Sequence, residues 1–548
     1  MMKTARFSRP VALSLLVASL GSARVLAAEG APLKSVARKV EAQVAAPNAR
    51  TMYLTTDKPL YHPGETVWFR AWELAVKTME GVAGEHGVTF QLFDPRGSKV
   101  AEKRVLGSGG AAMNDFELSP ALVGGPYVLR MLSDLGGTEE RAITVSTYEL
   151  PRVKKTLDFG RKSYSPAEEV TANVKLESAT GEAVHGGKAT AVITIDGAEI
   201  ARINVMIDWN GKGKVRFALP RSIARGDGLL TLLVDAGGIT ESIQKRIPIL
   251  LDRAEFTAFP EGGDLVMGLP SRVYVSARDP PGKPAEFEGD VVDERGAVIT
   301  HVRSFHGGMA RFTLTPEKGK SYSLRPGKAL AATPPLALPA ARPSGCTLKT
   351  VDDFRSTEAA LRVIVRCTTP QKVLATAVLR ERLIARVEGQ VSPGAAAELS
   401  IPLPKGTVGA VRLTLFDLTE APLAERLVYR GLGADLHVTV TPDRASYSPR
   451  EKVALTVKTT DADGRPVPAD VALAVVDDTV INFAGDKTGN ILAQLYLEPE
   501  MPGQTVAEPN FYFSKDPKAP EALDLVLGTQ GWRRFEWAWV KQAAAVAR

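Results

Sequence analysis

Two cysteines are the residues of this chain best suited to form a covalent cross-link. Cys346 and Cys367 are its only cysteines. An isolated pair in an oxidising compartment is typically bonded, which predicts a Cys346–Cys367 disulfide. The bond would close a loop of about 20 residues and contribute roughly 3 kcal/mol in the chain-entropy model. The alternative is a pair of buried thiols.

Residues with catalytic or metal-binding chemistry are scattered. The six histidines include no His-Glu-x-x-His motif and no i,i+4 pair, and the chain has no Gly-x-Ser-x-Gly motif. His301 and His306 flank a turn and are not expected to hold a metal. The acids Glu168 and Glu169 would point to opposite faces of a strand. The sequence therefore predicts no catalytic, cofactor-binding or metal-binding residues, and a protein that is not an enzyme.

The N-terminus has the features of an export signal. Lys3, Arg6 and Arg9 precede an apolar run over residues 11–20, and small residues follow at 25–28. Residues 1–28 are predicted to be a signal peptide and residues 29–49 a lead-in linker. The rest of the chain contains no run of about 20 apolar residues, so no transmembrane helix is predicted. We expect an exported protein in the periplasm, at the periphery of the outer membrane, or outside the cell.

The charge of the chain argues against nucleic-acid binding. The formal net charge is +6, and four of the basic residues lie within the first 28 positions. The remainder carries about +2, which gives no indication of the concentrated basic face expected of a nucleic-acid-binding protein. The chain is long enough for three to six domains, each with its own core.

A turn followed by a strand recurs along the chain. In the first copy Pro63 and Gly64 suit a turn, and the residues after them alternate between apolar and polar, as in a half-buried strand. Each copy is marked by a tyrosine two residues before a proline, at Tyr61, Tyr164 and Tyr447, and a weaker copy has Met267 in the tyrosine position. The copies at 61, 164 and 267 are equally spaced by about a hundred residues, the size of one whole β-domain.

Residues 56–67 resemble the opening strand of a macroglobulin domain of the alpha-2-macroglobulin family, and residues 148–152 resemble the strand that leads into the next one. The likeness runs from about residue 50 to the C-terminus. It implies an all-β fold of tandem antiparallel macroglobulin-type β-sandwiches, similar to immunoglobulin and fibronectin domains. The expected domains are residues 50–147, 148–251, 252–341, 342–434 and 435–548. Residues 88–105 and 416–428 are expected to be equivalent hairpins of two of them.

The pattern changes to helix beyond residue 478. Residues 490–497 and 520–527 are predicted to be helices, which makes a short helical C-terminal segment. Between them, residues 498–519 contain four prolines together with Lys515 and Lys518. We expect this stretch to be an exposed, bait-like loop and the most protease-sensitive part of the chain. The alternative is that the aromatic residues 511–513 hold it against a sandwich.

A group of aromatic residues follows the second helix. Trp532, Phe535, Trp537 and Trp539 are too large and apolar to be left exposed together. They either complete the core of the fifth domain or form a docking patch for a partner, with Arg533 and Arg534 as polar anchors.

The family resemblance also bears on function. Family members that trap proteases covalently use a Cys-Gly-Glu-Gln motif, in which the glutamine side chain acylates the cysteine sulfur. Cys346 lies in Ser-Gly-Cys-Thr-Leu and Cys367 in Val-Arg-Cys-Thr-Thr, so neither can form this thioester. The half of a full family member that carries the thioester is expected to be absent.

Two functions remain open at this point. The chain is either a non-enzymatic module that binds or inhibits endopeptidases without covalent trapping, or a structural or adhesive scaffold of the cell envelope associated with an outer-membrane receptor. In both cases the partners are proteins, a protease or an envelope protein, and no cofactor is expected. The oligomeric state is not predicted by the sequence.

Overall fold

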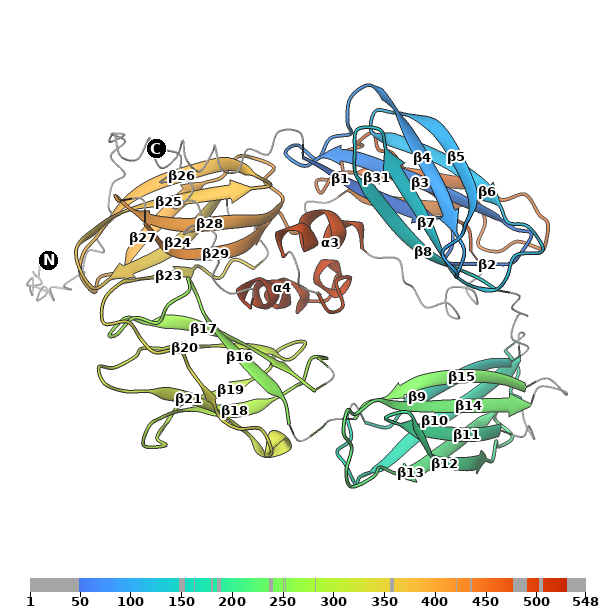
Figure 1. Cartoon of the computed structure of the whole chain (residues 1–548), viewed down its shortest axis with the longest axis horizontal. Coiled ribbons are helices and arrows are strands. Elements are labelled where there is room, and N and C mark those ends of the chain that lie inside the picture. Colours follow the sequence, from blue (N-terminus) through green and yellow to red (C-terminus); the bar gives the residue numbers. More distant parts are fainter. Residues whose placement is uncertain are drawn as a thin grey trace, which may run out of the picture.

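The computed structural model describes residues 49–146, 153–161, 163–178, 181–184, 189–235, 240–249, 251, 253–280, 282–354, 359–419, 421–433, 436–476, 490–501 and 506–529. The predicted signal peptide, the strand expected at 148–152 and the aromatic group at 532–539 lie outside these residues. Figure 1 shows four β-sandwiches placed around two central helices. The prediction of tandem antiparallel β-sandwiches with a short helical C-terminal segment is confirmed.

The first sandwich is a single folded sheet. Its strands follow the order β1-β3-β6-β5-β4-β7-β8-β2, and β5 meets β6 only through Ser108 and Ala111. Between the two layers, the ring of Phe69 lies 4.6 Å from that of Phe90 and 5.1 Å from that of Phe116. The strands are β1 Arg50–Thr56, β2 Leu60–Tyr61, β3 Thr66–Ala75, β4 Glu85–Phe93, β5 Lys99–Ser108, β6 Ala111–Glu117, β7 Gly125–Ser133 and β8 Thr138–Val145.

The second sandwich packs a three-stranded sheet, β13-β10-β9, on a four-stranded sheet, β12-β11-β14-β15. Strands of this kind form because every second side chain is apolar and enters the core, as Leu230, Leu232 and Val234 do in β14. The strands are β9 Val153–Phe159, β10 Glu169–Ser178, β11 Ala189–Ile195, β12 Ala198–Val205, β13 Lys212–Ala218, β14 Gly228–Asp235 and β15 Thr240–Ile247.

The third and fourth sandwiches repeat this three-plus-four pattern. The third contains β16 Glu255–Pro260, β17 Ser271–Arg278, β18 Glu288–Asp293, β19 Val298–Arg303, β20 Met309–Leu314, β21 Tyr322–Pro326, the short helix η1 Lys328–Leu330 and β22 Leu336–Ala337. The fourth contains β23 Cys346–Thr350, β24 Ala360–Cys367, β25 Gln371–Leu379, β26 Arg382–Val391, β27 Ala397–Pro402, β28 Gly409–Asp417 and β29 Pro422–Arg430. We propose that the four sandwiches are domains with the boundaries expected from the sequence.

Two details of the predicted repeat are wrong. The hairpin at 416–428 is β28–β29, the last pair of its sheet β26-β25-β28-β29, whereas residues 88–105 form β4–β5, the equivalent of β25–β26. The shared Phe-Asp turn misled the comparison, because such a turn suits any hairpin. Met267 does not take the place of the tyrosine either. Tyr61 and Tyr164 form parallel bridges with Val145 and Ile249, whereas in the third sandwich the parallel bridge is made by Val266, with Arg342.

The copies of the tyrosine motif share one geometry, which includes residues that the sequence pattern had not singled out. In each copy a basic residue three positions before the tyrosine lies over its ring, at 5.0, 4.6 and 4.8 Å. A glutamate four positions after the tyrosine pairs with that basic residue at 2.7, 3.3 and 3.5 Å. The three sets are Lys58, Tyr61 and Glu65; Arg161, Tyr164 and Glu168; and Arg444, Tyr447 and Glu451. The fixed spacing would have predicted these contacts.

The fifth unit is represented among the described residues by one hairpin, β30 His437–Pro442 with β31 Leu455–Thr460. One of its faces carries Val438, Val440 and Val457, which are 47, 44 and 39 % exposed. In the first two sandwiches the motif tyrosine is fully buried, whereas Tyr447 is only half-buried.

Two helices follow, as predicted. α3 spans Ile491–Tyr496 and α4 spans Ala519–Gly528, with the short helices η2 Glu498–Glu500 and η3 Phe511–Phe513 between them. Asn490 caps α3 by accepting a hydrogen bond from the backbone N–H of Leu492 at 2.9 Å. Neither helix, nor any other in the described part of the chain, has the length and apolar character needed to cross a bilayer.

Candidate functional site

The helical segment packs into the junction of the third and fourth sandwiches. We call the buried residues of this junction the interdomain cluster. It combines side chains from β17, β20, β28 and β29 with side chains from the helical segment: Tyr274, Met309, Ala410, Leu427, Tyr429, Leu497, Met501, Tyr512, Ala522, Leu523, Leu525, Val526 and Leu527. Elements more than 200 residues apart in sequence therefore share one core.

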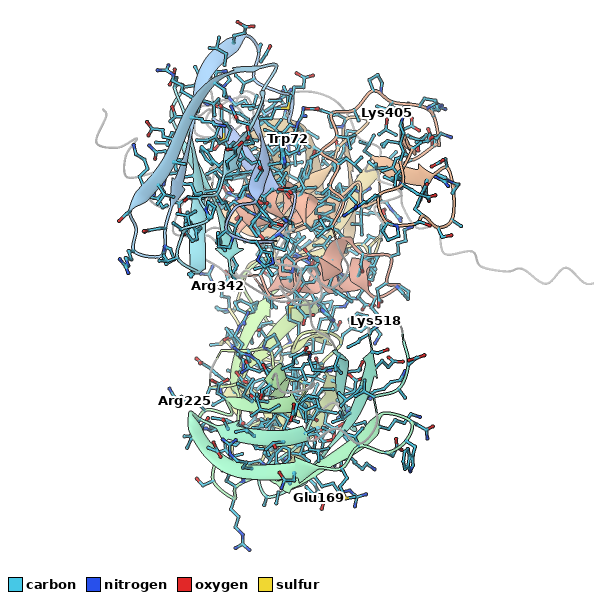
Figure 2. The ribbon with its side chains drawn as sticks, turned by 90° about the vertical axis from the view of Figure 1, so that its right-hand side faces the viewer. Trp72, Glu169, Arg225, Arg342, Lys405 and Lys518 are labelled. Carbon is cyan, nitrogen blue, oxygen red and sulfur yellow. A yellow bond between two sulfur atoms is a disulfide. The ribbon has the colours of Figure 1, made fainter. Side chains whose placement is uncertain are left out.

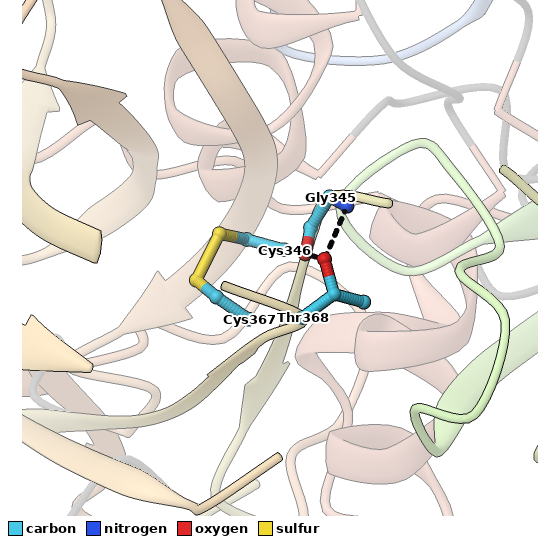
Figure 3. Close-up of a disulfide and its surroundings, with 4 residues drawn as sticks. All are labelled: Gly345, Cys346, Cys367 and Thr368. Atoms are coloured by element: carbon cyan, nitrogen blue, oxygen red, sulfur yellow. Dashed lines mark hydrogen bonds between the residues drawn. A yellow bond between two sulfur atoms is a disulfide. The ribbon is translucent and has the colours of Figure 1, made fainter. Parts of the chain in front are cut away.

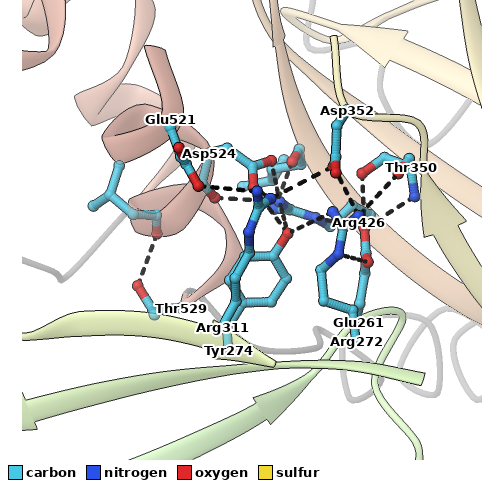
Figure 4. A network of polar contacts seen from close by, with 12 residues as sticks. Glu261, Arg272, Tyr274, Arg311, Thr350, Asp352, Arg426, Glu521, Asp524 and Thr529 are labelled. Atoms are coloured by element: carbon cyan, nitrogen blue, oxygen red, sulfur yellow. Dashed lines mark hydrogen bonds and ion pairs between the residues drawn. The ribbon is translucent and has the colours of Figure 1, made fainter. Parts of the chain in front are cut away.

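A network of buried charges lies at the centre of this cluster (Figure 4). β17 and β20 place Tyr274 opposite Arg311 on the outer face of their sheet, and α4 lies across them. Asp524 of α4 accepts hydrogen bonds from the Tyr274 hydroxyl at 2.9 Å and from Arg311 at 3.1 Å. Arg311 also pairs with Glu521, one turn earlier in α4, at 3.0 Å.

Arg426 brings the fourth sandwich into the same network. Its Nη2 lies 2.7 Å from Asp524 Oδ1 and 2.9 Å from the Tyr274 hydroxyl, and its Nε lies 3.4 Å from Glu261. The side chain is only 3 % exposed, so its charge depends on these partners. An arginine buried in this way is stable only while its carboxylates remain in place.

Glu261, which follows β16 in the third sandwich, connects that sandwich to the fourth. It is 3 % exposed and accepts hydrogen bonds from the backbone and hydroxyl of Thr350, at 3.1 and 2.8 Å. Arg272 reaches Glu261 at 3.5 Å and Asp352 at 2.7 Å. Each sandwich thus contributes both a cation and an anion to the junction.

The electrostatics of the network stabilise its hydrogen bonds and ion pairs, and with them the contact between α4 and the two sandwiches. Burial raises the pKa of Tyr274, so its hydroxyl stays protonated and donates to Asp524. Burial alone would lower the pKa of Arg426, but Tyr274, Asp524 and Glu261 raise it overall, so the guanidinium stays charged. The cavity beside Asp524 has a volume of about 20 Å³. The arrangement can join α4 to two sandwiches.

Within the stretch 498–519, residues 511–513 do not belong to the exposed loop that we expected. Tyr512 is 2 % exposed, the Phe511 ring stacks on His306 at 3.9 Å, and Phe513 lies 5.6 Å from Tyr429. The aromatic residues hold the segment against two sandwiches, which is the alternative that the sequence left open. Burial, with Glu508 close by, raises the pKa of Tyr512 to about 12. Residues 514–518 remain exposed.

The helical segment also reaches the first sandwich. Gln494 of α3 donates a hydrogen bond to Glu139 at 2.7 Å, and burial raises the pKa of that glutamate. On its other side the segment meets the fourth sandwich, where Arg380 lies 5.4 Å from the ring of Tyr496 and Arg412 pairs with Glu500 at 3.2 Å. One short segment therefore touches three of the four sandwiches (Figure 1).

The fifth unit makes its own contact with the first sandwich. Asp470 pairs with Arg70 of β3 and accepts a hydrogen bond from the indole of Trp72 at 3.0 Å. In consequence, the segment after β31 lies against the outside of the first sandwich.

The two cysteines lie side by side on β23 and β24 (Figure 3). Cys346 and Cys367 are paired across the hairpin, and their sulfur atoms are 2.04 Å apart, the length of a disulfide bond. Next to them, Gly345 and Thr368 are joined by three hydrogen bonds, at 3.0, 3.1 and 3.4 Å. That the exported protein carries this disulfide remains a prediction.

The histidines singled out in the sequence are separated in the structure. His301 pairs with Asp290 at 3.0 Å on an exposed strand, and His306 stacks on Phe511. Within the residues that the structure describes, no group of three or more histidine, cysteine or acidic side chains is arranged to hold a metal ion.

The residues of the charge network were not found in the sequence, although a signal was present. Asp524 is a lone acid in an otherwise apolar turn of helix, Ala-Leu-Asp-Leu-Val-Leu. Arg272 stands beside the apolar run Val-Tyr-Val in β17. A charge within an apolar stretch is either a surface residue or one of a buried pair, and only the three-dimensional arrangement identifies the partner.

These features define a chain of immunoglobulin-like sandwiches joined by a helical segment. Residues 51–146 match the family described as MG2 domain. The chain is 24 % identical over 490 residues to alpha-2-macroglobulin of Ralstonia nicotianae, an alignment that covers 78 % of this chain and 30 % of the relative. The resemblance to the alpha-2-macroglobulin family is confirmed, and the chain is a macroglobulin-like protein that spans less than a third of the length of the curated relative it matches.

The similar solved structures include two bacterial alpha-2-macroglobulins. The trypsin-activated alpha-2-macroglobulin of Escherichia coli matches with a TM-score of 0.43 and 13 % identity, covering 78 % of this chain and 34 % of that one. The Salmonella alpha-2-macroglobulin reacted with methylamine matches with a TM-score of 0.37 and 13 % identity, covering 82 % and 34 %.

Proposed function

We propose that this chain is an exported, non-enzymatic protein that binds endopeptidases through its macroglobulin-type sandwiches without a covalent thioester. The observation that carries the proposal is the position of residues 514–518. These five residues are exposed, while Tyr512 on one side and α4 on the other are buried in the interdomain cluster. A protease that cuts here separates two anchors of the same core.

The consequence of such a cut follows from the packing. Lys515 and Lys518 are exposed side chains that a trypsin-like protease recognises. While the chain is intact, a short connection joins η3 to α4. When one of them is bound to the interdomain cluster, the effective concentration of the other at the cluster is therefore high. After a cut, α4 keeps its ion pairs with Arg311 and Arg426, but η3 can leave separately. We expect the junction of the third and fourth sandwiches to loosen and the bound protease to become hindered toward large substrates.

Limited proteolysis tests the proposal. The mature chain is treated with trypsin, the first cuts are mapped by mass spectrometry, and the shape of the chain is followed by small-angle X-ray scattering. Inhibition is assayed with one protein substrate and one small peptide substrate. We expect the first cuts at Lys515 or Lys518, a change in shape, and slower hydrolysis of the protein substrate alone.

A matched pair of variants makes the test specific. Lys515→Gln with Lys518→Gln removes the two sites, and Lys405→Gln removes one site from an exposed turn of the fourth sandwich (Figure 2). Only the first variant should abolish the change in shape. First cuts in the connections between sandwiches, or unchanged hydrolysis of the protein substrate, would contradict the proposal.

The contacts of the helical segment with three sandwiches favour a second function, a cell-envelope scaffold that docks to an outer-membrane receptor. Such a protein would benefit from the rigidity that the charge network provides. If the chain is cut without any change in shape and is recovered from envelope extract with an outer-membrane protein, the scaffold function replaces the inhibitor function.

A further inference from the structure

A cleft of about 740 Å³ lies next to the interdomain cluster, over the outer face of the three-stranded sheet of the third sandwich. Strand pairing arranges this face in three rows. The first row is Phe259, Tyr274 and Arg311; the second is Thr257, Ser276 and Met309; the third is Glu255 and Arg278. α4 covers the first row through the charge network, and the cleft lies over the other two.

α4 runs toward this cleft. Asp524 bonds to Arg311 in the first row, and five residues later the hydroxyl of Thr529 lies 3.7 Å from the sulfur of Met309 in the second. Five helical residues rise about 7.5 Å, close to the spacing of about 7 Å between rows on a strand. Thr529 itself lines the cleft. Thr529, the last described residue of the chain, therefore lies at the cleft, and the axis of α4 points from the first row toward the third.

The lining of the cleft combines apolar and acidic groups. Phe259, Val506 and the buried Tyr512 supply apolar and aromatic surface. Three glutamates line the cleft against two basic residues, so that carboxylates exceed cations by one: Glu255, Glu286 and Glu508, with Arg278 and Lys283. Arg278 already donates a hydrogen bond to the carbonyl of Gly282 at 2.9 Å. Such a lining suits an aromatic side chain next to arginines.

We propose that this cleft binds an aromatic–arginine peptide and that its occupant is the chain's own segment 531–535, Gly-Trp-Arg-Arg-Phe. Trp532 is three residues beyond Thr529, a reach of about 10 Å, which is enough to arrive at the third row. Its indole packs on the apolar surface that Phe259, Val506 and Tyr512 supply, and Arg533 and Arg534 meet the carboxylates. This docking is independent of protease binding.

Hydrogen–deuterium exchange on the full chain tests the docking. We expect the amides of residues 531–535 to exchange at least tenfold more slowly than those of an unstructured peptide of the same sequence. Glu508→Arg and, as a second variant at the start of β16, Glu255→Arg should each raise this exchange rate about tenfold. Trp532→Ala should speed exchange in β16 as well, because the floor of the cleft becomes uncovered.

Glu294→Arg is the control, since it makes the same charge change in an exposed turn of the same sandwich outside the cleft. It should leave exchange unchanged. Exchange of 531–535 at the unstructured rate in the unmodified chain would overturn the proposal, and so would equal effects of Glu508→Arg, Glu255→Arg and Glu294→Arg. Protection that appears only at high protein concentration would show that a second copy fills the cleft, which also overturns docking within one chain.

Discussion

Removal of the Asp524 carboxylate should release α4 from the two sandwiches that it joins. Asp524→Ala removes a hydrogen-bond acceptor from Tyr274 and from Arg311, and it removes the nearest carboxylate from Arg426. Arg311 still pairs with Glu521 and is 19 % exposed, so the loss of its contact with Asp524 costs little free energy. Arg426 is the costly member, because its side chain is 3 % exposed and the carboxylate left to it is Glu261, at the longer distance of 3.4 Å. Its hydrogen bonds to the Tyr274 hydroxyl and to the Leu427 carbonyl are uncharged and remain.

The size of the effect follows from these contacts. Breaking a buried ion pair by removing one partner costs about 3–5 kcal/mol, because the other charge stays buried. The remaining contact to Glu261 places the expected value at the lower end, about 3 kcal/mol, which is more than a hundredfold in the docking equilibrium. Asp524→Asn keeps one acceptor and should cost less. Arg426→Met combined with Asp524→Leu should recover part of the loss, because it removes both charges.

Exchange of the α4 amides measures the free energy of its opening directly. The control is Glu199→Ala, which breaks the ion pair of 2.9 Å between Glu199 and Arg202, whose side chains are 46 and 54 % exposed. An exposed pair contributes at most about 1 kcal/mol, so this variant should leave α4 unaffected. If Asp524→Ala opened α4 no more than Glu199→Ala does, the network would not be what holds the helix.

Three further predictions follow from other parts of the chain. Cys346→Ser with Cys367→Ser should lower the free energy of unfolding of the fourth sandwich by about 3 kcal/mol, because the closed loop spans 21 residues; chemical denaturation measures this, and recovery of both cysteines as alkylatable thiols in the exported protein would contradict it. Gly528→Ala places a new Cβ 2.4 Å from the ring of Tyr274, which is fully buried, so it should lower the melting temperature by overpacking worth about 1–3 kcal/mol, whereas Gly160→Ala meets nothing closer than 3.5 Å and should not. Burial raises the pKa of Asp196, but three backbone amides at 224, 225 and 227 lower it overall, so the stability it contributes is present above its unfolded pKa of about 3.9 and is lost as the pH falls through the lower folded pKa; Asp196→Asn should flatten this acid dependence in unfolding followed between pH values of about 6 and 2.

The sandwiches could be predicted from the sequence because their signals are local. Period-two alternation, proline and glycine turns, and the tyrosine motif each act within a few residues, and they set the strands wherever they occur. The error at 416–428 has the same origin. A turn such as the one after Phe416 shows that a hairpin is present, but not which pair of the sheet it joins.

The interdomain cluster depended on contacts that no local pattern contains. Tyr274 and Asp524 are 250 positions apart, and their pairing depends on the position of α4 across β17. One sign of that position was available in β17 itself. Val273, Tyr274 and Val275 are all fully buried, so both faces of this strand are covered. A strand that is apolar at consecutive positions belongs to a sheet with something packed on its outer face as well as on its inner one. The run Arg-Val-Tyr-Val therefore carried the information that a further element must lie on the third sandwich, and the apolar turn around Asp524 was the element that still needed a surface to cover.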